Sequence, residues 1–270
     1  HPTPTTAWPT LEDYLKAIYI LDEEGVHLIA ARVAEFMGIS APTVSQALRR
    51  LERDGYVEFL SDHQIRLTER GRLEAERVVR RHRIVERWLT ETIGLDWATA
   101  DEEAHRLEHA ISDEVEQGLD RIMHYPKRCP HGNPIPGRSV VAHPGGKELA
   151  AVEPGTMVVV ERIREQAEEI RPLLDALGAM AVFPGKVLTV LESSPYTGVV
   201  IWHDGERDVL SLDTAAQVWV YPLPKRGADG RDGQSGARVP RELPEESDAS
   251  EIEGDRGRSG EIEGREQEAV

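Results

Sequence analysis

Two histidines and a glutamate follow one another closely in the motif His105-x-x-Glu108-His109. If the segment is helical, spacings of three and four residues place the three side chains on one helix face, where they can share one metal ion. The same pattern is found in a class of zinc metallopeptidases, in which the glutamate is the general base. The motif therefore indicates a metal site, and taken alone it favours the peptidase slightly.

Three further residues extend this donor set on two other predicted helices. His82 and Glu86 repeat the four-residue spacing, and Asp13 adds a carboxylate near the start of the chain. Asp13 could simply cap its helix, and His82 and Glu86 could be a surface pair. Together with the motif at 105–109, donors on three neighbouring helices favour a metal site, and a peptidase gives no reason for the additional donors.

A second group of potential ligands begins at Cys129 and His131. Glu86 could complete this group, helped by an acid or amide from the C-terminal domain such as Glu165, Gln166 or Glu169. Cys129 could equally be a small buried residue. We predict an ancillary metal site here, with Glu169 as the donor from the C-terminal domain.

The region before most of these ligands predicts a winged helix-turn-helix. Two short helices over 29–37 and 41–54 precede a hairpin over 57–67. Ser40 can cap the second helix, and Pro42 is tolerated in its first turn, where its missing N–H is not needed. In such a fold the second helix enters the major groove of DNA.

The leading turn of the helix over 41–54 carries side chains suited to reading bases. Pro42 and Thr43 can contact thymine methyl groups and Gln46 can pair with adenine, whereas arginines hold phosphates. The predicted DNA-binding residues are Ser40, Pro42, Thr43, Ser45, Gln46, Arg49, Arg50 and Arg66. A purely structural helical hairpin is the alternative.

Helical periodicity predicts three longer helices that would position the ligands. The first starts after Thr10, the second spans 68–92, and the third spans 99–123 and opens with a capping box of Thr99 and Glu102. The metal-binding motif would then lie in the middle of the third helix.

The C-terminal part predicts a small β domain followed by a tail. One helix is expected near 172–177, and five short apolar runs predict strands at 156–162, 186–191, 198–202, 209–212 and 218–220. From residue 226 the chain is dense in Gly, Glu, Arg, Ser and Pro and has no aromatic residue, which predicts disorder.

The net charge of −17 argues against DNA binding, because DNA-binding proteins gain affinity by neutralising phosphates. Part of this charge lies in the tail, which has 7 basic and 13 acidic residues from residue 226 onward, and bound divalent cations would offset more. A single cysteine excludes an intrachain disulfide, no apolar run could span a bilayer, and no signal peptide is evident. We therefore expect a cytoplasmic protein without a membrane partner.

Several short motifs occur in an order that resembles the diphtheria toxin repressor family of metal-dependent regulators, over about 10–222. They are Pro42-Thr43-Val44-Ser45-Gln46, Glu52-Arg53-Asp54-Gly55, Thr68 with Gly71, Glu108-His109, Ser112-Asp113-Glu114-Val115-Glu116 and Gly132-Asn133-Pro134-Ile135-Pro136. The resemblance implies a mainly α protein with a small β part: an N-terminal winged helix-turn-helix, a helical dimerisation domain and a C-terminal SH3-like small β-barrel. We expect the domains at 8–73, 74–138 and 149–223, with a linker over 139–148 and a disordered acidic tail over 224–270.

The resemblance also implies a repressor that binds double-stranded operator DNA as a homodimer and controls metal-uptake genes. The iron-responsive branch carries Met and Cys where this chain has Asp13 and His105, so the chain is more similar to the manganese-responsive branch. That branch usually has Glu in place of His105, and some members carry an acidic ligand where this chain has Lys16. The pair Cys129 and His131 resembles the ancillary site of some manganese regulators. Carboxylate and imidazole donors suit Mn²⁺ or Fe²⁺, and Zn²⁺ or Co²⁺ would bind more tightly in vitro.

These features predict a metal-gated repressor. Without metal, the carboxylates of Asp13, Glu86 and Glu108 would repel one another and leave the DNA-reading domain loosely attached. A bound ion would tie Asp13 to the motif at 105–109. Two alternatives stay open: the zinc metallopeptidase, and a winged-helix regulator that senses an organic ligand.

Overall fold

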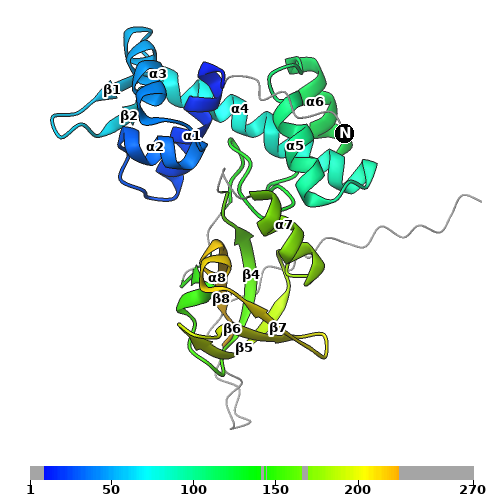
Figure 1. Ribbon diagram of the computed structural model, residues 1–270. Coiled ribbons are helices and arrows are strands. Elements are labelled where there is room, and N and C mark those ends of the chain that lie inside the picture. The colour runs from blue at the N-terminus through cyan, green and yellow to red at the C-terminus, as the bar shows by residue number, and fades with distance from the viewer. Residues whose placement is uncertain (1–8, 141–142, 144, 166–169, 225–270) are drawn as a thin grey trace, which may run out of the picture. The chain divides into compact units, whose positions relative to one another are not determined.

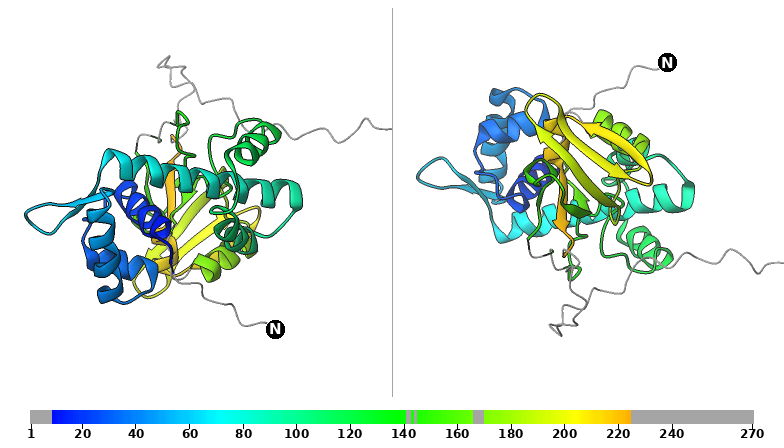
Figure 2. Two further views of the ribbon diagram at one scale, coloured as in Figure 1. Left: turned by 90° about the horizontal axis from the view of Figure 1, so that it is seen from above. Right: turned by 90° about the horizontal axis from the view of Figure 1, so that it is seen from below.

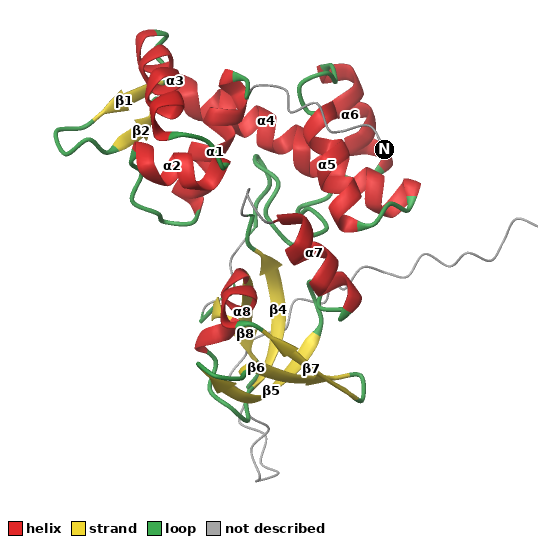
Figure 3. Ribbon diagram, in the orientation of Figure 1, coloured by secondary structure: helices red, strands yellow, loops and turns green. Residues whose placement is uncertain are grey.

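The computed structural model describes residues 9–140, 143, 145–165 and 170–224 and begins with a winged helix-turn-helix. The elements of this domain are α1 (Leu11–Glu23), α2 (Ala30–Met37), α3 (Ala41–Arg53), β1 (Val57–Phe59) and β2 (Ile65–Leu67). The two strands pair antiparallel, and Figures 1 and 3 show their hairpin beside α2 and α3. The predicted helices and hairpin are confirmed.

Side-chain caps fix the starts of the two helices that carry predicted functional residues. Thr10 and Asp13 form a capping box at α1, in which Asp13 Oδ2 accepts a hydrogen bond from the Thr10 amide at 2.6 Å. Ser40 caps α3 by accepting a hydrogen bond from the amide of Thr43, and Pro42 lies in the first turn as expected. Both helix starts therefore follow from local sequence.

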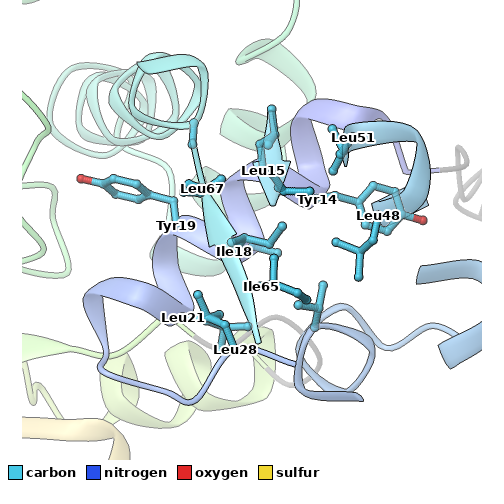
Figure 4. Close-up of a cluster of buried hydrophobic side chains, with 14 of the residues drawn as sticks. Tyr14, Leu15, Ile18, Tyr19, Leu21, Leu28, Leu48, Leu51, Ile65 and Leu67 are labelled. Atoms are coloured by element: carbon cyan, nitrogen blue, oxygen red, sulfur yellow. The ribbon is translucent and has the colours of Figure 1, made fainter. Parts of the chain in front are cut away.

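An apolar core holds α1 against α3 and the hairpin. Leu15 and Ile18 of α1, Leu48 of α3 and Ile65 of β2 are at most 1% exposed. Figure 4 shows these side chains pointing toward one another. Burying one Leu or Ile side chain stabilises a fold by about 1.5–3 kcal/mol. This core therefore fixes α3 relative to α1, the helix that carries Asp13.

A long helix leads from the winged helix into a second helical region. α4 spans Glu69–Trp88 and continues into a π-helical turn, Leu89–Ile93. Thr68 caps it by accepting a hydrogen bond from the amide of Gly71 at 3.0 Å. Figure 2 shows α4 running past α1 toward the helices coloured green. The helix predicted over 68–92 is confirmed.

The single helix predicted over 99–123 is wrong, because this segment forms two helices. α5 spans Trp97–Leu107 and α6 spans Asp113–Ile122. The His-x-x-Glu-His motif at 105–109 therefore lies across the end of α5 and not inside a continuous helix. Its glutamate is the C-cap residue of α5, and its second histidine belongs to the following turn.

Two side-chain caps explain these helix boundaries. Asp96 accepts a hydrogen bond from the amide of Thr99 at 2.9 Å, so the capping box predicted for Thr99 and Glu102 is wrong. Ser112 caps α6 by accepting a hydrogen bond from the amide of Val115. Acidic residues fill the first turn of α6, where the helix dipole favours negative charge.

The described part of the C-terminal domain contains a six-stranded antiparallel sheet in the order β3-β8-β4-β5-β6-β7. Its strands are β3 (Lys147–Glu148), β4 (Met157–Ile163), β5 (Val187–Ser194), β6 (Gly198–His203), β7 (Glu206–Leu210) and β8 (Val218–Pro222). Its helices are α7 (Ile170–Ala179), α8 (Leu212–Gln217) and a 3-10 turn, Leu149–Ala151. Four of the five predicted strands and the helix near 172–177 are confirmed, the strand predicted at 209–212 corresponds in part to β7, and β3 and α8 are additions.

The predicted strand at 209–212 ends earlier than expected, because Ser211 caps α8 through the amide of Thr214 at 3.0 Å. The predicted disorder from residue 226 onward concerns residues outside the described ranges. Among the helices that the structure describes, none combines the length and the apolar character needed to cross a membrane.

Substitution of Gly71 in α4 can test how closely this helix packs against the residues just before the hairpin. A Cβ at Gly71 would lie 1.9 Å from the carbonyl oxygen of Tyr56, whereas at Gly118 the nearest atom, on Arg121, is 4.0 Å away. We expect Gly71→Ala to lower the free energy of unfolding by about 1–3 kcal/mol, since backbone must move. The control Gly118→Ala should leave it unchanged or raise it by up to about 1 kcal/mol. Urea unfolding measures both, and a Gly71→Ala protein as stable as wild type would contradict this packing.

Candidate metal centre

Four side chains converge at the end of α5 to form what we call the first cluster. One donor atom from each of Asp13, His105, Glu108 and His109 lies within 4.8 Å of the others. Asp13 comes from α1, and the other three come from the last turn of α5 and the residues after it. The Glu108 side chain is fully buried while that of His105 is 55% exposed, so the cluster extends from the interior to solvent. The structure thus brings these four predicted ligands together.

The two carboxylate oxygens of Glu108 face different partners. Oε1 lies 3.2 Å from His105 Nδ1 and 3.4 Å from His109 Nε2, on the side of the first cluster. Oε2 lies 2.8 Å from Lys16 Nζ and 2.6 Å from His82 Nδ1. Because Lys16 is on α1 and His82 is on α4, Glu108 connects both helices to the end of α5.

Asp13 divides its two oxygens in a similar way. Oδ2 completes the capping box of α1 with Thr10, and Oδ1 lies 2.9 Å from His109 Nε2. The other ring nitrogen of His109, Nδ1, lies 2.6 Å from an oxygen of Glu12. The helix cap that the sequence offered as an alternative role for Asp13 is present, and it leaves Oδ1 directed at the cluster.

Positive charges within the region compensate these carboxylates. Burial alone would raise the pKa of Glu108, but Lys16 and His82 hold it well below its usual range. The hydrogen bond that the His109 ring donates to the Asp13 carboxylate raises the pKa of His109 to about 9. Burial and Lys16 would lower the pKa of His82, but contact with Glu108 helps to raise it to about 9. The repulsion predicted among metal-free carboxylates is therefore reduced, and metal binding must displace protons from imidazole.

A second cluster is completely buried. Glu86 from α4, Cys129 and His131 each place one donor atom within 4.8 Å of the others. Burial, reinforced by Glu86, raises the pKa of the Cys129 thiol. His131 Nδ1 lies 2.7 Å from Glu86 Oε1. Both oxygens of Glu86 and Nε2 of His131 are buried without a hydrogen bond of good geometry in the part of the chain that the structure describes.

Unsatisfied buried polar atoms are costly, so the free atoms of the second cluster need a partner. An imidazole nitrogen, a carboxylate oxygen and a thiol sulfur converging within a few ångströms are suitable ligands for a divalent transition metal. The residues present therefore fit a metal ion. The ligand roles predicted for both clusters stay predictions at this point.

Two acidic residues of this region were not identified from the sequence. Asp101 Oδ1 lies 3.3 Å from His82 Nε2, and His82, Glu86 and Asp101 place donor atoms within 4.8 Å of one another. Asp101 is four residues before His105, so the helical spacing could have revealed it. Glu12, which contacts His109, has no such signal, because that contact depends on how α1 packs against the end of α5.

Of the three donors considered from the β domain, the structure describes only Glu165, and its carboxylate is already paired. Both oxygens of Glu165 are hydrogen-bonded to Arg83, at 3.0 and 3.2 Å. Gln166 and Glu169 lie outside the described residues. The predicted role of Glu169 therefore stays a prediction.

The predicted DNA-binding residues lie along α3 and the hairpin. The exposed members are Ser40, Pro42, Gln46, Arg49, Arg50 and Arg66, and the half-buried members are Thr43 and Ser45. A groove of about 920 Å³ is lined by several of these α3 residues and by the N-terminal turn of α1. Arg66 is paired with Glu58 at 2.6 Å, so a phosphate would have to compete with this ion pair.

A winged helix joined through α1 to a cluster of carboxylates and imidazoles defines a class of protein, the DNA-binding regulators that respond to a metal ion. Residues 8–63 match the family described as iron dependent repressor, N-terminal DNA binding domain. Residues 68–137 match its metal binding and dimerisation domain, and residues 147–222 match the FeoA domain. The chain belongs to the iron-dependent repressor family, whose members are metal-dependent transcriptional repressors.

Relatives of known function support this assignment. The chain is 40% identical over 211 residues to the iron-dependent repressor IdeR of Mycobacterium tuberculosis, which covers 74% of this chain and 91% of IdeR. It is 48% identical over 150 residues to the diphtheria toxin repressor of Corynebacterium diphtheriae, which covers 56% of this chain and 65% of that protein.

Solved structures agree on the fold. A manganese-dependent transcriptional repressor in complex with manganese matches with a TM-score of 0.70 and 33% identity, covering 79% of this chain and 100% of that one. The manganese regulator SloR matches with a TM-score of 0.66 and 30% identity, covering 80% of this chain and 100% of SloR.

The two alternatives that the sequence left open are not supported. The family consists of DNA-binding repressors and not of enzymes, and its central domain is a metal-binding domain. The geometry also disfavours a peptidase. A general base needs an oxygen free to take a proton from water, and Glu108 Oε2 is held by Lys16 and His82.

The metal-free protein should lose stability as the pH rises toward 9. The pKa values of His82 and His109 rise from 6.5 to about 9 on folding. Their stabilising effect is therefore complete below pH 6.5 and is lost as the pH rises through 9. Urea unfolding in chelator across this range should show a falling free energy of unfolding, and His109→Gln should flatten part of the fall. His27→Gln, at an exposed histidine, is the control. Identical pH profiles for wild type and His109→Gln would show that the Asp13–His109 pair does not contribute to the pH dependence of the free energy of unfolding.

Proposed function

We propose that this chain is a repressor that binds double-stranded operator DNA as a homodimer when Mn²⁺ or Fe²⁺ is bound. The observation that carries the proposal is that the residues of the first cluster come from two different domains. Asp13 belongs to the DNA-binding domain, whereas His105, Glu108 and His109 belong to the metal-binding and dimerisation domain. Ligands from two domains make metal binding depend on how those domains are arranged. The same arrangement determines how α3 is presented to DNA.

The donor set of the first cluster favours Mn²⁺ or Fe²⁺. It consists of two carboxylates and two imidazoles and contains no sulfur, a combination that suits these ions. Some of the relatives found by sequence are named for iron, and several structural neighbours are named for manganese. We favour Mn²⁺, because Asp13 and His105 supply oxygen and nitrogen where the iron-responsive relatives are expected to supply sulfur. Zn²⁺ and Co²⁺ should bind more tightly in vitro, because affinity follows the general stability series of divalent ions.

We assign the second cluster, made of Glu86, Cys129 and His131, to an ancillary metal site. Its buried atoms without hydrogen-bond partners support this role. The ring of His131 also packs edge-on against Trp97, with ring centroids 4.8 Å apart, which helps to orient it. Glu169 is our candidate for a further donor. His82 contacts Glu108 of the first cluster, and one of its donor atoms lies within 4.8 Å of a donor atom of Glu86 in the second cluster. We therefore assign His82 to the link between the two sites.

Residues of the first cluster couple the two domains through α1. Asp13 holds the first turn of α1 with Oδ2 and offers Oδ1 to the cluster. A bound divalent cation would supply the positive charge that the leaving proton of His109 takes away. Asp13 then stays next to Glu108, and α1 stays against the end of α5. Because α1 shares a core with α3, fixing α1 also fixes the helix that reads DNA.

In a homodimer the two α3 helices would then be held at a spacing that suits successive major-groove faces, about 34 Å apart. Such coupling between metal and DNA is typically ~1–3 kcal/mol and is reciprocal, so operator DNA should tighten metal binding. We propose metal-uptake genes as targets, the cytoplasm as the location, and the predicted domain boundaries as those of the folded units. The exposed arginines of α3, Arg49 and Arg50, provide local positive charge on an acidic protein.

Binding of the full chain to a promoter fragment of a manganese-uptake gene tests the proposal. We expect no retardation in excess chelator and clear retardation when Mn²⁺ or, under anaerobic conditions, Fe²⁺ is added, because the metal completes the link between the domains. A gel mobility-shift titration for each ion ranks the metals. Zn²⁺ is titrated for comparison, as an ion that should bind tightly but that we do not propose as the physiological metal. Binding that is unaffected by chelator would contradict metal gating.

Substitution of Asp13 separates metal sensing from DNA reading. Asp13→Asn keeps an oxygen that can accept from Thr10 but removes a charged ligand, so we expect the Mn²⁺ concentration needed for DNA binding to rise about tenfold or more. Asp22→Asn changes an exposed carboxylate on the same helix and should behave as wild type. Arg49→Ala should weaken DNA binding at every metal concentration while leaving the number of bound ions unchanged. Wild-type metal dependence in Asp13→Asn would exclude Asp13 as a ligand.

A further inference from the structure

Lys16 lies at the first cluster but has no part in the proposed function. It is one turn after Asp13 on α1, and its side chain is 14% exposed. Its ammonium Nζ lies 2.8 Å from Glu108 Oε2 and 2.9 Å from His82 Nδ1. Lysines are rarely buried to this extent unless their charge is paired, so the position of this ammonium requires an explanation.

The atoms around the ammonium are those that a metal ion would bind. Glu108 Oε2 and His82 Nδ1 lie 2.6 Å apart and both contact Lys16. Asp101 Oδ1 lies 3.3 Å from the other nitrogen of His82 and helps to orient that imidazole. Carboxylate oxygens and imidazole nitrogens in this arrangement are the same donor types as in the first cluster. The contacts of the ammonium therefore match the first shell of a cation.

Space does not limit this region to a single ion. A cavity of about 710 Å³ adjoins the cluster, and its lining includes Asp13, Lys16, His82, Asp101, His105 and His109. Glu108 has one oxygen on the side of His105 and His109 and one on the side of His82. A carboxylate placed in this way can bridge two cations, and the second position is already taken by the ammonium.

We propose that Lys16 is a tethered cation that takes the place of a second metal ion on Glu108 and restricts the first cluster to one ion. The inference rests on the proposed metal-binding function. By holding Oε2, Lys16 leaves Glu108 only Oε1 to offer to the cluster. Lys16 is thus a positioning residue, which sets how many oxygens of Glu108 and how many ions the site can use.

The ammonium also lowers the affinity of the first ion. Before metal binds, Lys16 compensates the buried charge of Glu108. After metal binds, it is a positive charge close to another positive charge in a poorly solvated site. Both effects oppose metal binding. Removing the charge should therefore raise the affinity for Mn²⁺ by about tenfold or more.

Two variants of the full chain and one control test this inference. Lys16→Glu replaces the ammonium by a carboxylate, and Lys16→Met removes the charge but keeps an unbranched side chain. Lys147→Glu makes the same charge change on β3, which pairs with β8 of the β domain. Equilibrium titration gives the Mn²⁺ equivalents bound per chain and their affinities. Electron paramagnetic resonance distinguishes isolated Mn²⁺ from two ions that share a carboxylate, because such a pair is spin-coupled.

We expect Lys16→Glu to bind one more Mn²⁺ per chain than wild type and to show the spin-coupled signal. Lys147→Glu should match wild type. Lys16→Met should bind its first ion about tenfold or more tightly than wild type. If Lys16→Glu does not fold, the affinity of Lys16→Met for Mn²⁺ decides whether the inference holds. Wild-type stoichiometry in folded Lys16→Glu together with wild-type affinity in Lys16→Met would overturn the inference.

Failure of the proposed function would look different. Wild-type protein that binds no Mn²⁺, or that binds DNA equally well in chelator, would contradict the metal-gated repressor and with it the role of Lys16. A wild-type protein that binds DNA only with metal, alongside Lys16 variants with unchanged stoichiometry and affinity, would overturn only the role of Lys16.

Discussion

A buried negative charge at the end of α5 determines how the helical part of this protein is held together. The side chain of Glu108 has no exposed surface, and an unpaired charge in the interior costs several kcal/mol. Its partners are Lys16 from α1, His82 from α4, and His105 and His109 beside it. Moving α1 or α4 away from the end of α5 would remove one of the partners of that charge. The contact between the DNA-binding and dimerisation domains and the geometry of the first cluster therefore have the same origin.

The other end of α1 is also held by charge. Glu24, the C-cap residue of α1, lies 2.6 Å from Arg162 Nη1 and 2.6 Å from Arg164 Nε, in and just after β4. Arg83 of α4 makes a matching contact with Glu165. α1 is thus connected to the first cluster at its first turn and to the β domain at its last. A shift of α1 would have to break ion pairs at both ends, so the β domain contributes to the position of the reading helix.

Local signals were sufficient for most of the fold but only for part of the site. Caps at Thr10 and Ser40 predict the starts of α1 and α3, because they depend on residues a few positions apart. The end of α5 was missed, since apolar spacing continues from Leu107 to Ile111 across the turn and hides the cap at Ser112. Ligands on one helix follow from spacing alone. The contact of Lys16 with Glu108 depends on how α1 packs against α4 and α5, which spacing within one helix does not contain.

The same dependence on packing explains why a His-x-x-Glu-His motif here suits a ligand set and not a hydrolytic centre. A catalytic glutamate must exchange a proton with water, which requires an accessible oxygen and a pKa near the working pH. Glu108 has the opposite properties: Lys16 and His82 hold Oε2, and burial is outweighed by charges that keep its pKa well below the usual range. A metal ligand benefits from both, because it must stay charged and keep one orientation. The charged residues that surround the motif, and not the residue pattern of the motif alone, determine which chemistry it can support.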